Sequence, residues 1–282
     1  TFSADTFFSA IALEALSMED DTFRELYEAV SNNKLIFSDA CPFINEQLYV
    51  PKPFIHVERE KGDMSSKQKK FAKKLKYLPV DRMEDFFSGS LNLEKEVKNF
   101  SSLGKKVEKV SVSIYGEEEP KPYRVAAYCF NENCGLYICV RYEENRELQL
   151  FEKLLDALSY SGIGGERSSG YGRFTFKVEE VPRSLAKRFD EKYKTYMTLS
   201  SCMASEEELD DVVVDACFQL KKRSGFVDSG KKVNQNLRKK DYYMFSSGSC
   251  FKKKFYGEIA DVRRNGDHPV YRYAKAMMIG VN

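Results

Sequence analysis

A loop at residues 161–176, SGIGGERSSGYGRFTF, contains five glycines and two arginines and is well equipped to bind a ligand. Glycines let a backbone approach a sugar-phosphate chain closely, and their amides can form an anion-binding nest. Arg167 and Arg173 add guanidinium groups that contact phosphate in bidentate fashion. Ser168 and Ser169 add hydroxyl groups, and Tyr171 offers a ring on which a base can stack. This composition favours RNA binding over the alternative, a turn that only lets a helix pack close to a sheet.

The order of elements around this loop argues against the common nucleotide sites. A dinucleotide site needs a strand before the loop and a helix after it, whereas here the helix comes first. The loop therefore lies at the negative end of the helix dipole, which repels an anion unless the arginines intervene. The Gly-Lys-Ser/Thr ending of a P-loop is missing. GIGG fits the GXXG loop of a KH domain, but that loop lies between two helices, whereas here a strand is predicted after it. The segment SGYGRFTF is similar to the aromatic strand motif of RNA-recognition domains, but it has Ser169 at the basic position and Arg173 inserted before Phe174.

Two histidines, His56 and His268, are the candidates for acid–base catalysis. A metal-independent RNA endonuclease needs a general base and a general acid beside the 2′-hydroxyl group, and nothing in the sequence places the two histidines together. Cys129 and Cys134 are separated by four residues, unlike the pairs of a structural zinc site, so we expect neither a metal nor a cofactor. Seven scattered cysteines are typical of a reduced, cytoplasmic protein.

Charge is unevenly distributed along the chain, although the formal net charge is only +2. Residues 218–256 contain eleven lysines and arginines and two aspartates, whereas acidic clusters lie at 117–119 and 206–211. Segregated charge predicts a positive face, whose partner could be RNA or protein. No apolar run approaches the roughly 18 residues that a membrane span needs, and no secretion leader opens the chain.

Periodicity places the loop within an α+β pattern. Helices are predicted near the start, with Ser3 as N-cap, at about 21–32, from residue 65 to Pro79, and over ELQLFEKLLDALSYSG, which ends at Gly162. Alternation predicts a strand pair formed by PYRVAAYCFN and GLYICVRYE around a turn at 131–135, and another strand at GRFTFKVEEV. Pro182 marks a boundary, after which Ser205 and Glu208 make the capping box of a short helix at 206–214 among several strands.

Four stretches of the chain resemble the RAMP proteins of CRISPR systems and, more narrowly, the family of fourth subunits of type III-A (Csm) interference complexes. They are FSADTFFSAIALEAL near the start, FSDACPFINEQLYVPKPF at 37–54, the loop GIGGERSSGYGRF after a long amphipathic helix, and HPVYRYAKAMMIGV at the end. They occur in the order of the family and span nearly the whole chain. The family opens with a β-strand before the first helix, and that strand is missing from this sequence.

The resemblance implies two ferredoxin-like (RRM-like) domains with antiparallel sheets. They would be residues 1–181, with an inserted basic segment at about 60–108, and residues 182–282. It implies a non-catalytic subunit that grips the 5′ repeat-derived tag of the guide RNA in antiviral defence. The implied protein partners are the large polymerase-like subunit and the RAMP backbone subunit, with no membrane and no small-molecule substrate. The alternative is a RAMP endoribonuclease that processes repeat RNA.

Carried over residue by residue, the resemblance also implies the RNA contacts. Ser3, Asp5 and Thr6 lie at the start of the first helix, beside the RNA path of the family, and Lys52 and His56 face the tag. For His268, Tyr271 and Arg272 a solvated or core role is an equal alternative. The glycine-rich loop contributes the largest set, with five glycines that shape it and five side chains that contact RNA: Gly162, Gly164, Gly165, Gly170, Gly172, Arg167, Ser168, Ser169, Tyr171 and Arg173.

Overall fold

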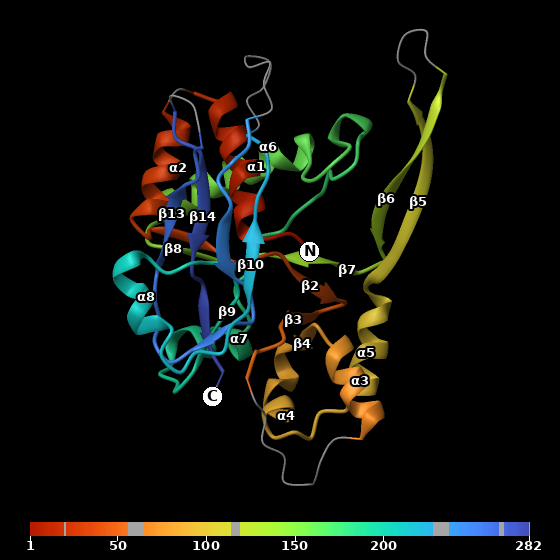
Figure 1. The fold of residues 1–282 in the computed structure, drawn as a ribbon, viewed down its shortest axis with the longest axis vertical. Helices are drawn as coiled ribbons and strands as arrows, with labels where there is room; N and C mark the ends of the chain where they lie inside the picture. Colours follow the sequence, from red (N-terminus) through yellow and green to blue (C-terminus); the bar gives the residue numbers. More distant parts are fainter. Residues whose placement is uncertain (20, 56–64, 114–118, 228–236, 265–267, 282) are drawn as a thin grey trace. The chain divides into compact units, whose positions relative to one another are not determined.

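The computed structural model describes residues 1–19, 21–55, 65–113, 119–227, 237–264 and 268–281. The chain folds into two compact units (Figure 1). Unit 1 comprises Thr1–Ala40, Pro51–His56 and Ile138–Asn282, and unit 2 comprises Cys41–Val50 and Val57–Tyr137. These compact units differ from the expected domains, residues 1–181 and 182–282, because unit 2 is inserted in the sequence of unit 1. The assignment of two ferredoxin-like domains stays a prediction.

Unit 1 combines helices with antiparallel strand pairs. Its strands pair as β1–β8, β10–β11, β13–β14 and β12–β9–β15, and every one of these pairings is antiparallel. The expectation of an α+β chain with antiparallel sheets is confirmed. The elements of unit 1 are α1 (Ala4–Ser17), α2 (Thr22–Ser31), β1 (Leu35–Phe37), β8 (Val140–Tyr142), α6 (Asn145–Ser161), η3 (Arg167–Ser169), α7 (Arg183–Asp190), β9 (Tyr196–Thr198), α8 (Glu206–Val212), β10 (Leu220–Arg223), β11 (Tyr242–Phe245), β12 (Cys250–Phe251), β13 (Gly257–Asp261), β14 (Tyr271–Lys275) and β15 (Met278–Gly280).

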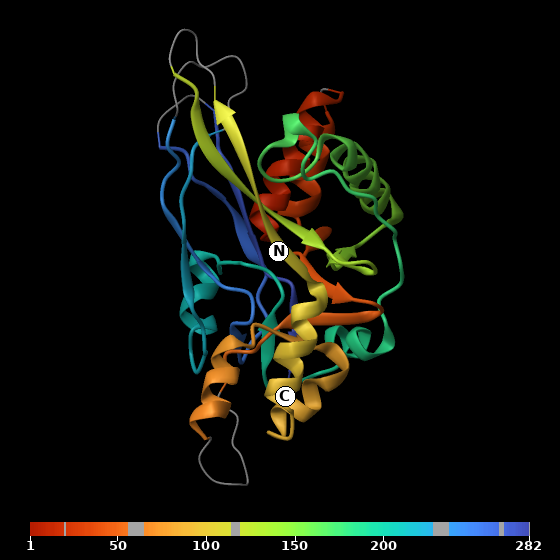
Figure 2. The ribbon, with the colours of Figure 1, turned by 90° about the vertical axis from the view of Figure 1, so that its right-hand side faces the viewer.

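The core of unit 1 is built around α1, which packs against α2, α6 and β14. Figures 1 and 2 show α1 and α6 on one side of β13 and β14. The apolar face of α1 is buried as its spacing predicts, and Phe7 lies against Phe37 with ring centroids 5.4 Å apart. Tyr273 closes the core because its hydroxyl donates to the Phe37 carbonyl oxygen and accepts from the Phe37 amide, both at 2.9 Å. Aromatic burial of this kind contributes about 1.5–3 kcal/mol for each large side chain.

Unit 2 contains a four-stranded sheet of order β4-β3-β2-β7 and a separate two-stranded ribbon, β5–β6. Leu75, Leu78 and Phe86 belong to a small buried cluster among its helices. The helix predicted from residue 65 to Pro79 ends at Lys74, because residues 77–79 join the four-stranded sheet as a strand. The elements of unit 2 are β2 (Cys41–Ile44), β3 (Gln47–Pro51), α3 (Ser66–Lys74), β4 (Tyr77–Pro79), η1 (Val80–Arg82), α4 (Met83–Phe87), α5 (Leu93–Phe100), η2 (Ser101–Leu103), β5 (Gly104–Ser113), β6 (Lys121–Phe130) and β7 (Cys134–Tyr137).

The prediction that PYRVAAYCFN and GLYICVRYE pair with each other around a turn at residues 131–135 is wrong. β6 pairs with β5 over ten residues, from Gly104 opposite Phe130 onwards. The run GLYICVRYE is divided between β7, which pairs with β2, and β8, which pairs with β1. Alternating apolar residues indicate that a segment is extended, but the partner is decided by which edge buries its side chains, and here that edge is distant in sequence.

The strand predicted over GRFTFKVEEV, residues 172–181, is also absent, because these residues pair with no other strand of the described chain. The Phe174 amide donates to the Ser159 carbonyl oxygen, and the side chain of Val178 is 58% exposed. A helix that the periodicity did not indicate, α7, follows directly after Pro182 and buries Leu185. Pro182 is the N-cap of α7, where its missing N–H group removes no intrahelical hydrogen bond.

Candidate nucleic-acid interface

The glycine-rich loop (residues 162–173) begins where α6 ends. The Gly162 amide donates to the Leu158 carbonyl oxygen at 2.7 Å, and its φ of 81° turns the chain away from the helix, as the sequence predicts. The two arms of the loop meet at a hydrogen bond of 3.0 Å from the Ile163 amide to the Gly172 carbonyl oxygen. Between the arms the chain makes the short turn η3, preceded by Glu166 at a φ of 57°. The loop is therefore closed at its base by its own backbone.

The five glycines of this loop fall into two groups. A Cβ atom on Gly172 would lie 2.2 Å from the Ile163 carbonyl oxygen, and one on Gly162 would lie 2.9 Å from the Tyr171 carbonyl oxygen. These two glycines set the shape of the loop because no other residue fits between its arms. The outer group comprises Gly164, Gly165 and Gly170, where a Cβ atom would meet nothing within 4 Å. The outer glycines therefore offer open backbone to an approaching ligand.

The side chains of the loop supply free positive charge. Arg173, Ser168 and Ser169 are exposed, and Arg167 and Tyr171 are partly exposed. Among the residues that the structure describes, neither arginine has an ion-pair partner. Two unpaired guanidinium groups counter the negative end of the α6 dipole, so the loop can accept a phosphate group where the helix alone would repel it.

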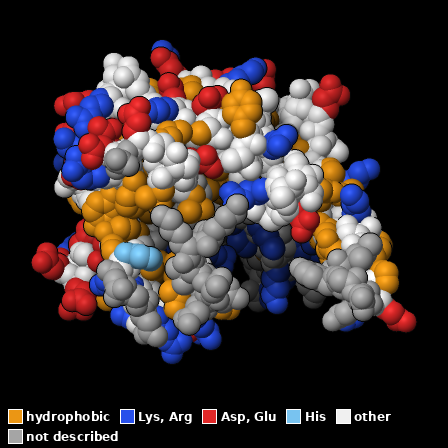
Figure 3. Space-filling model, turned by 90° about the horizontal axis from the view of Figure 1, so that it is seen from above, with side chains coloured by type: hydrophobic (Ala, Val, Ile, Leu, Met, Phe, Trp, Pro, Cys, Tyr) orange, Lys and Arg blue, Asp and Glu red, His pale blue; other side chains and the backbone are white. Residues whose placement is uncertain are grey.

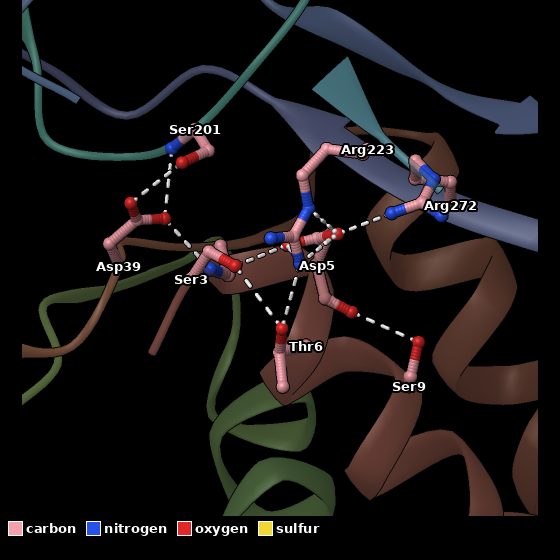
Figure 4. Close-up of polar contacts among 9 residues, drawn as sticks. Ser3, Asp5, Thr6, Ser9, Asp39, Ser201, Arg223 and Arg272 are labelled. Carbon is pink, nitrogen blue, oxygen red and sulfur yellow. Dashed lines mark hydrogen bonds and ion pairs between the residues drawn. The ribbon is translucent and has the colours of Figure 1, made fainter. Parts of the chain in front are cut away.

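A second group of predicted residues lies at the start of α1, and there the structure shows a buried ion network (Figure 4). Asp5 is only 3% exposed and contacts two arginines from the other half of the chain. Arg223 donates from Nε and Nη2 to the two carboxylate oxygens at 3.0 Å each, and Arg272 Nη1 lies 2.6 Å from Oδ2. Arg223 also donates to Thr6 Oγ1 at 3.0 Å, and Ser3 Oγ donates to Asp5 Oδ1 at 2.5 Å.

Burial gives Asp5 and Arg272 a positioning role in this structure. Their side chains hold the start of α1 against β10 and β14, so direct contact with RNA would require the network to open. Burial lowers the pKa of Arg272, and the nearby Asp5 carboxylate opposes this shift. Ser3 and Thr6 are partly exposed, although their hydroxyl groups take part in the same network.

Asp39 makes a second buried connection at the same helix start. Its Oδ1 accepts from the Ala4 amide at 2.7 Å and from the Ser201 amide at 2.8 Å, and its Oδ2 accepts from Ser201 Oγ at 2.8 Å. The cap of α1 is therefore Asp39 from a distant segment, whereas the side chain of Ser3, at the predicted N-cap position, makes no capping hydrogen bond. Burial raises the pKa of Asp39, although these hydrogen bonds oppose the shift.

We expect Asp39→Asn to change how stability depends on pH. Because the pKa of Asp39 is higher in the folded than in the unfolded chain, its contribution to stability is present at low pH and is lost as pH rises through the folded pKa. The amide does not titrate, so the stability deficit of the variant relative to wild type should shrink from pH 4 to pH 7. Urea unfolding at several pH values measures this, and a deficit that grows with pH would contradict it.

The remaining predicted residues do not form one site. Lys52 is half-buried, and burial lowers its pKa. His56 lies outside the described residues. Tyr271 packs on Tyr27 with ring centroids 4.5 Å apart, which favours its core alternative. His268 is exposed.

The glycine-rich loop and the ion network lie near opposite ends of α1. Ser161, which precedes the loop, donates to Glu14 near the helix end at 2.5 Å, whereas Asp5 lies in the first turn. Nine residues of helix separate the two places, or about 14 Å at 1.5 Å per residue. The predicted contacts thus form two patches along one helix.

Residues with metal-binding side chains do not gather within the described parts of the chain: they contain no group of three or more histidines, cysteines, aspartates or glutamates suited to a metal ion. Within the same parts, no helix is both long and apolar enough to cross a membrane.

Comparison with known proteins matches almost the whole chain. A family model described as the RAMP superfamily matches residues 14–175, and a model described as the CRISPR Csm4 C-terminal domain matches residues 191–281. The protein named "CRISPR system Cms protein Csm4" from Mycobacterium tuberculosis is 36% identical over 279 residues, which cover 99% of this chain and 89% of that protein. The chain belongs to the Csm4 family. The protein of the same name from Streptococcus thermophilus is 34% identical, over 98% of this chain and 90% of its own length.

The chain shares its fold with one chain in each of several solved Csm3–Csm4 and Csm1–Csm4 assemblies. A chain of the Csm3–Csm4 subcomplex in the type III-A CRISPR-Cas interference complex superposes with a TM-score of 0.69 and 16% identity, covering 100% of this chain and 94% of that chain. A chain of the Csm1–Csm4 cassette in complex with cA4 superposes with a TM-score of 0.58 and 16% identity, covering 100% of this chain and 92% of that chain. The predicted resemblance to the type III-A CRISPR family of RAMP proteins is thereby confirmed at the level of family and fold.

Sequence reasoning did not single out two residues that organise the start of α1, Arg223 and Asp39. Arg223 is part of the basic run Lys221–Arg223, and only its contact with Asp5, 218 residues away, distinguishes it from its neighbours. Asp39 interrupts the apolar stretch LIFSDACPFI. A lone carboxylate between buried residues signals a capping or pairing role, because an unpaired buried charge is costly.

Proposed function

We propose that this chain is the non-catalytic, RNA-binding subunit of a type III-A CRISPR effector complex and that it grips the 5′ repeat-derived tag of the guide RNA. The observation that carries the proposal is the glycine-rich loop, which combines open backbone at Gly164, Gly165 and Gly170 with two arginines that have no ion-pair partner within the described chain. Such a loop can follow a sugar-phosphate chain, and Tyr171 can stack on a base.

The same proposal includes two protein partners. Solved structures of related fold are named as Csm3–Csm4 and Csm1–Csm4 assemblies. By analogy, this chain would join the large polymerase-like subunit to the RAMP backbone subunit. We also retain the two ferredoxin-like domains, because the boundary expected at 181/182 falls between the two family-model matches.

We expect the double variant Arg167→Ala/Arg173→Ala to bind tag RNA more weakly. Each lost phosphate contact on a single strand lowers the salt slope by about 0.7, so the slope should fall by about 1.4. Fluorescence anisotropy with a labelled single-stranded RNA that carries the tag, at several salt concentrations, measures this. The matched control is Arg82→Ala/Arg124→Ala, which removes two exposed arginines elsewhere and should leave the slope near that of the wild type.

An unchanged slope in the loop variant would contradict the proposed role of the loop. Cleavage of repeat RNA by the pure protein in EDTA would contradict the non-catalytic assignment, and loss of that cleavage in His56→Ala would favour the endoribonuclease instead.

A further inference from the structure

The ribbon formed by β10 and β11 has one inward and one outward face. Its two strands pair antiparallel with Lys222 opposite Tyr243 and Arg223 opposite Tyr242. On the inward face Arg223 contacts Asp5, and the Tyr242 hydroxyl donates to Glu258 at 2.8 Å. Directly opposed residues share one face of an antiparallel pair, so Lys222 and Tyr243 point together to the outer face.

The outward face combines positive charge with exposed rings. Tyr243 is 53% exposed, and Phe226, which bridges Arg238 beyond the strand pair in a register shifted by one residue, is 64% exposed. Residues 218–227 and 237–245 contain six lysines and arginines and one aspartate, Asp241. Hydrophobic side chains also lie among lysines and arginines elsewhere on the molecule (Figure 3), so exposure of apolar atoms alone marks no site. The pairing of a cation with a ring on one strand face is the more specific feature.

The ribbon is fixed to the start of α1, where part of the proposed RNA path lies. Arg223 reaches from β10 to both Asp5 and Thr6, and Figure 4 shows it approaching the helix from that strand. Arg223 thus fixes the ribbon beside the start of α1, whereas Lys222 and Tyr243 lie on the opposite face of the same strand pair. A strand of RNA that contacts both surfaces passes around the edge of the ribbon.

We propose that the outward face of the β10–β11 ribbon is a second contact surface for single-stranded RNA, an inference that rests on the proposed function. Tyr243 stacks on a base, and Lys222 and Arg238 bind the phosphates beside it. A polyanion with stackable bases fits this face better than a protein does, because the cores of protein interfaces are depleted in lysine.

Asp241 competes with RNA for these two cations. Its carboxylate lies 2.9 Å from Lys222 Nζ and 3.7 Å from Arg238 Nη2. The ion pair between Lys222 and Asp241 is easily broken, because both side chains are exposed and surface ion pairs are weak. A phosphate group can therefore replace Asp241 as the partner of both cations.

The test is a gain of affinity. Asp241→Asn removes the carboxylate that competes with phosphate for both cations, so we expect the labelled tag RNA to bind more tightly than to the wild type. The matched control is Asp211→Asn on α8, which removes the same charge from an exposed pair with Lys253 at 2.9 Å. If both variants change RNA binding equally, only net charge matters and the proposal is overturned.

A second variant tests stacking. Tyr243→Ala should weaken RNA binding about fivefold or more, the lower end for one stacked base. Tyr256→Ala, equally exposed at 54%, should leave binding unchanged. Equal affinities of the two variants, or loss only of protein partners on co-purification, would show a protein-docking surface instead. Failure of the proposed function is recognised separately, because it would leave the loop variant Arg167→Ala/Arg173→Ala with wild-type RNA affinity.

Discussion

Asp5→Ala is expected to lower the free energy of unfolding by about 3–5 kcal/mol, because removing one partner of a buried ion pair leaves the other charge uncompensated. Arg272, only 6% exposed, would lose its carboxylate partner. Its Nε already has no hydrogen-bond partner in the described chain, so little could replace the lost contact. Arg223 would remain nearby as a like charge, which adds repulsion. A decrease in Tm on the order of 10 °C follows for a chain of this size.

Urea unfolding of the full chain measures this effect. The matched control is Asp21→Ala, whose carboxylate pairs with Arg24 at 2.9 Å while both side chains are about two-thirds exposed. Exposed pairs contribute about 0–1 kcal/mol, so the control should be close to wild type. If the two variants were equally stable, the network would not hold the helix start, and the attachment of β10 to α1 would need another cause.

Helices with strong local signals could be predicted from the sequence, whereas α7 was not indicated by its periodicity. The apolar face of α6 recurs every three or four residues, and Gly162 ends the helix as expected. The capping box of Ser205 and Glu208 marks the start of α8 within seven residues of chain. Such signals concern neighbours along the chain, so no knowledge of distant contacts is needed to interpret them.

Strand partners could not be predicted in the same way. β6 has the alternation of a strand, but nothing within the segment indicates β5 as its partner. Residues 173–181 alternate as well and still pair with no strand of the described chain. Alternation reports that one face can be buried, whereas a ladder also needs an unpaired edge at the right place, which depends on the whole fold.

The candidate site shows the same division between local and distant information. Composition alone identified the glycine-rich loop and its two arginines. The roles of Asp5 and Arg272 were not accessible, because 267 residues separate them and a polar residue at a helix start is equally compatible with a ligand contact. Only their mutual burial shows that they form part of the framework that holds the start of α1.

Two glycine variants distinguish the shape of the loop from contact with RNA. Gly172→Ala places a Cβ atom 2.2 Å from the Ile163 carbonyl oxygen at a φ of 77°, so the arms of the loop must separate and Arg173 must move. We expect tag-RNA affinity to fall tenfold or more, equivalent to about 1.4 kcal/mol, because even one displaced charge-assisted hydrogen bond contributes that much. Thermal stability should fall as well, since a residue with a Cβ atom in the left-handed region costs about 1–2 kcal/mol.

Gly165→Ala is the matched partner of this variant. Its φ lies outside the left-handed region, and the new methyl group would meet nothing within 4 Å in the chain itself, so folding should be unaffected. Any loss of RNA affinity in Gly165→Ala would then report a ligand backbone that approaches this position closely, because an added methyl group has no other neighbour. If Gly172→Ala bound RNA as tightly as wild type, the closed base of the loop would have no part in binding, and the arginines would act without a defined geometry.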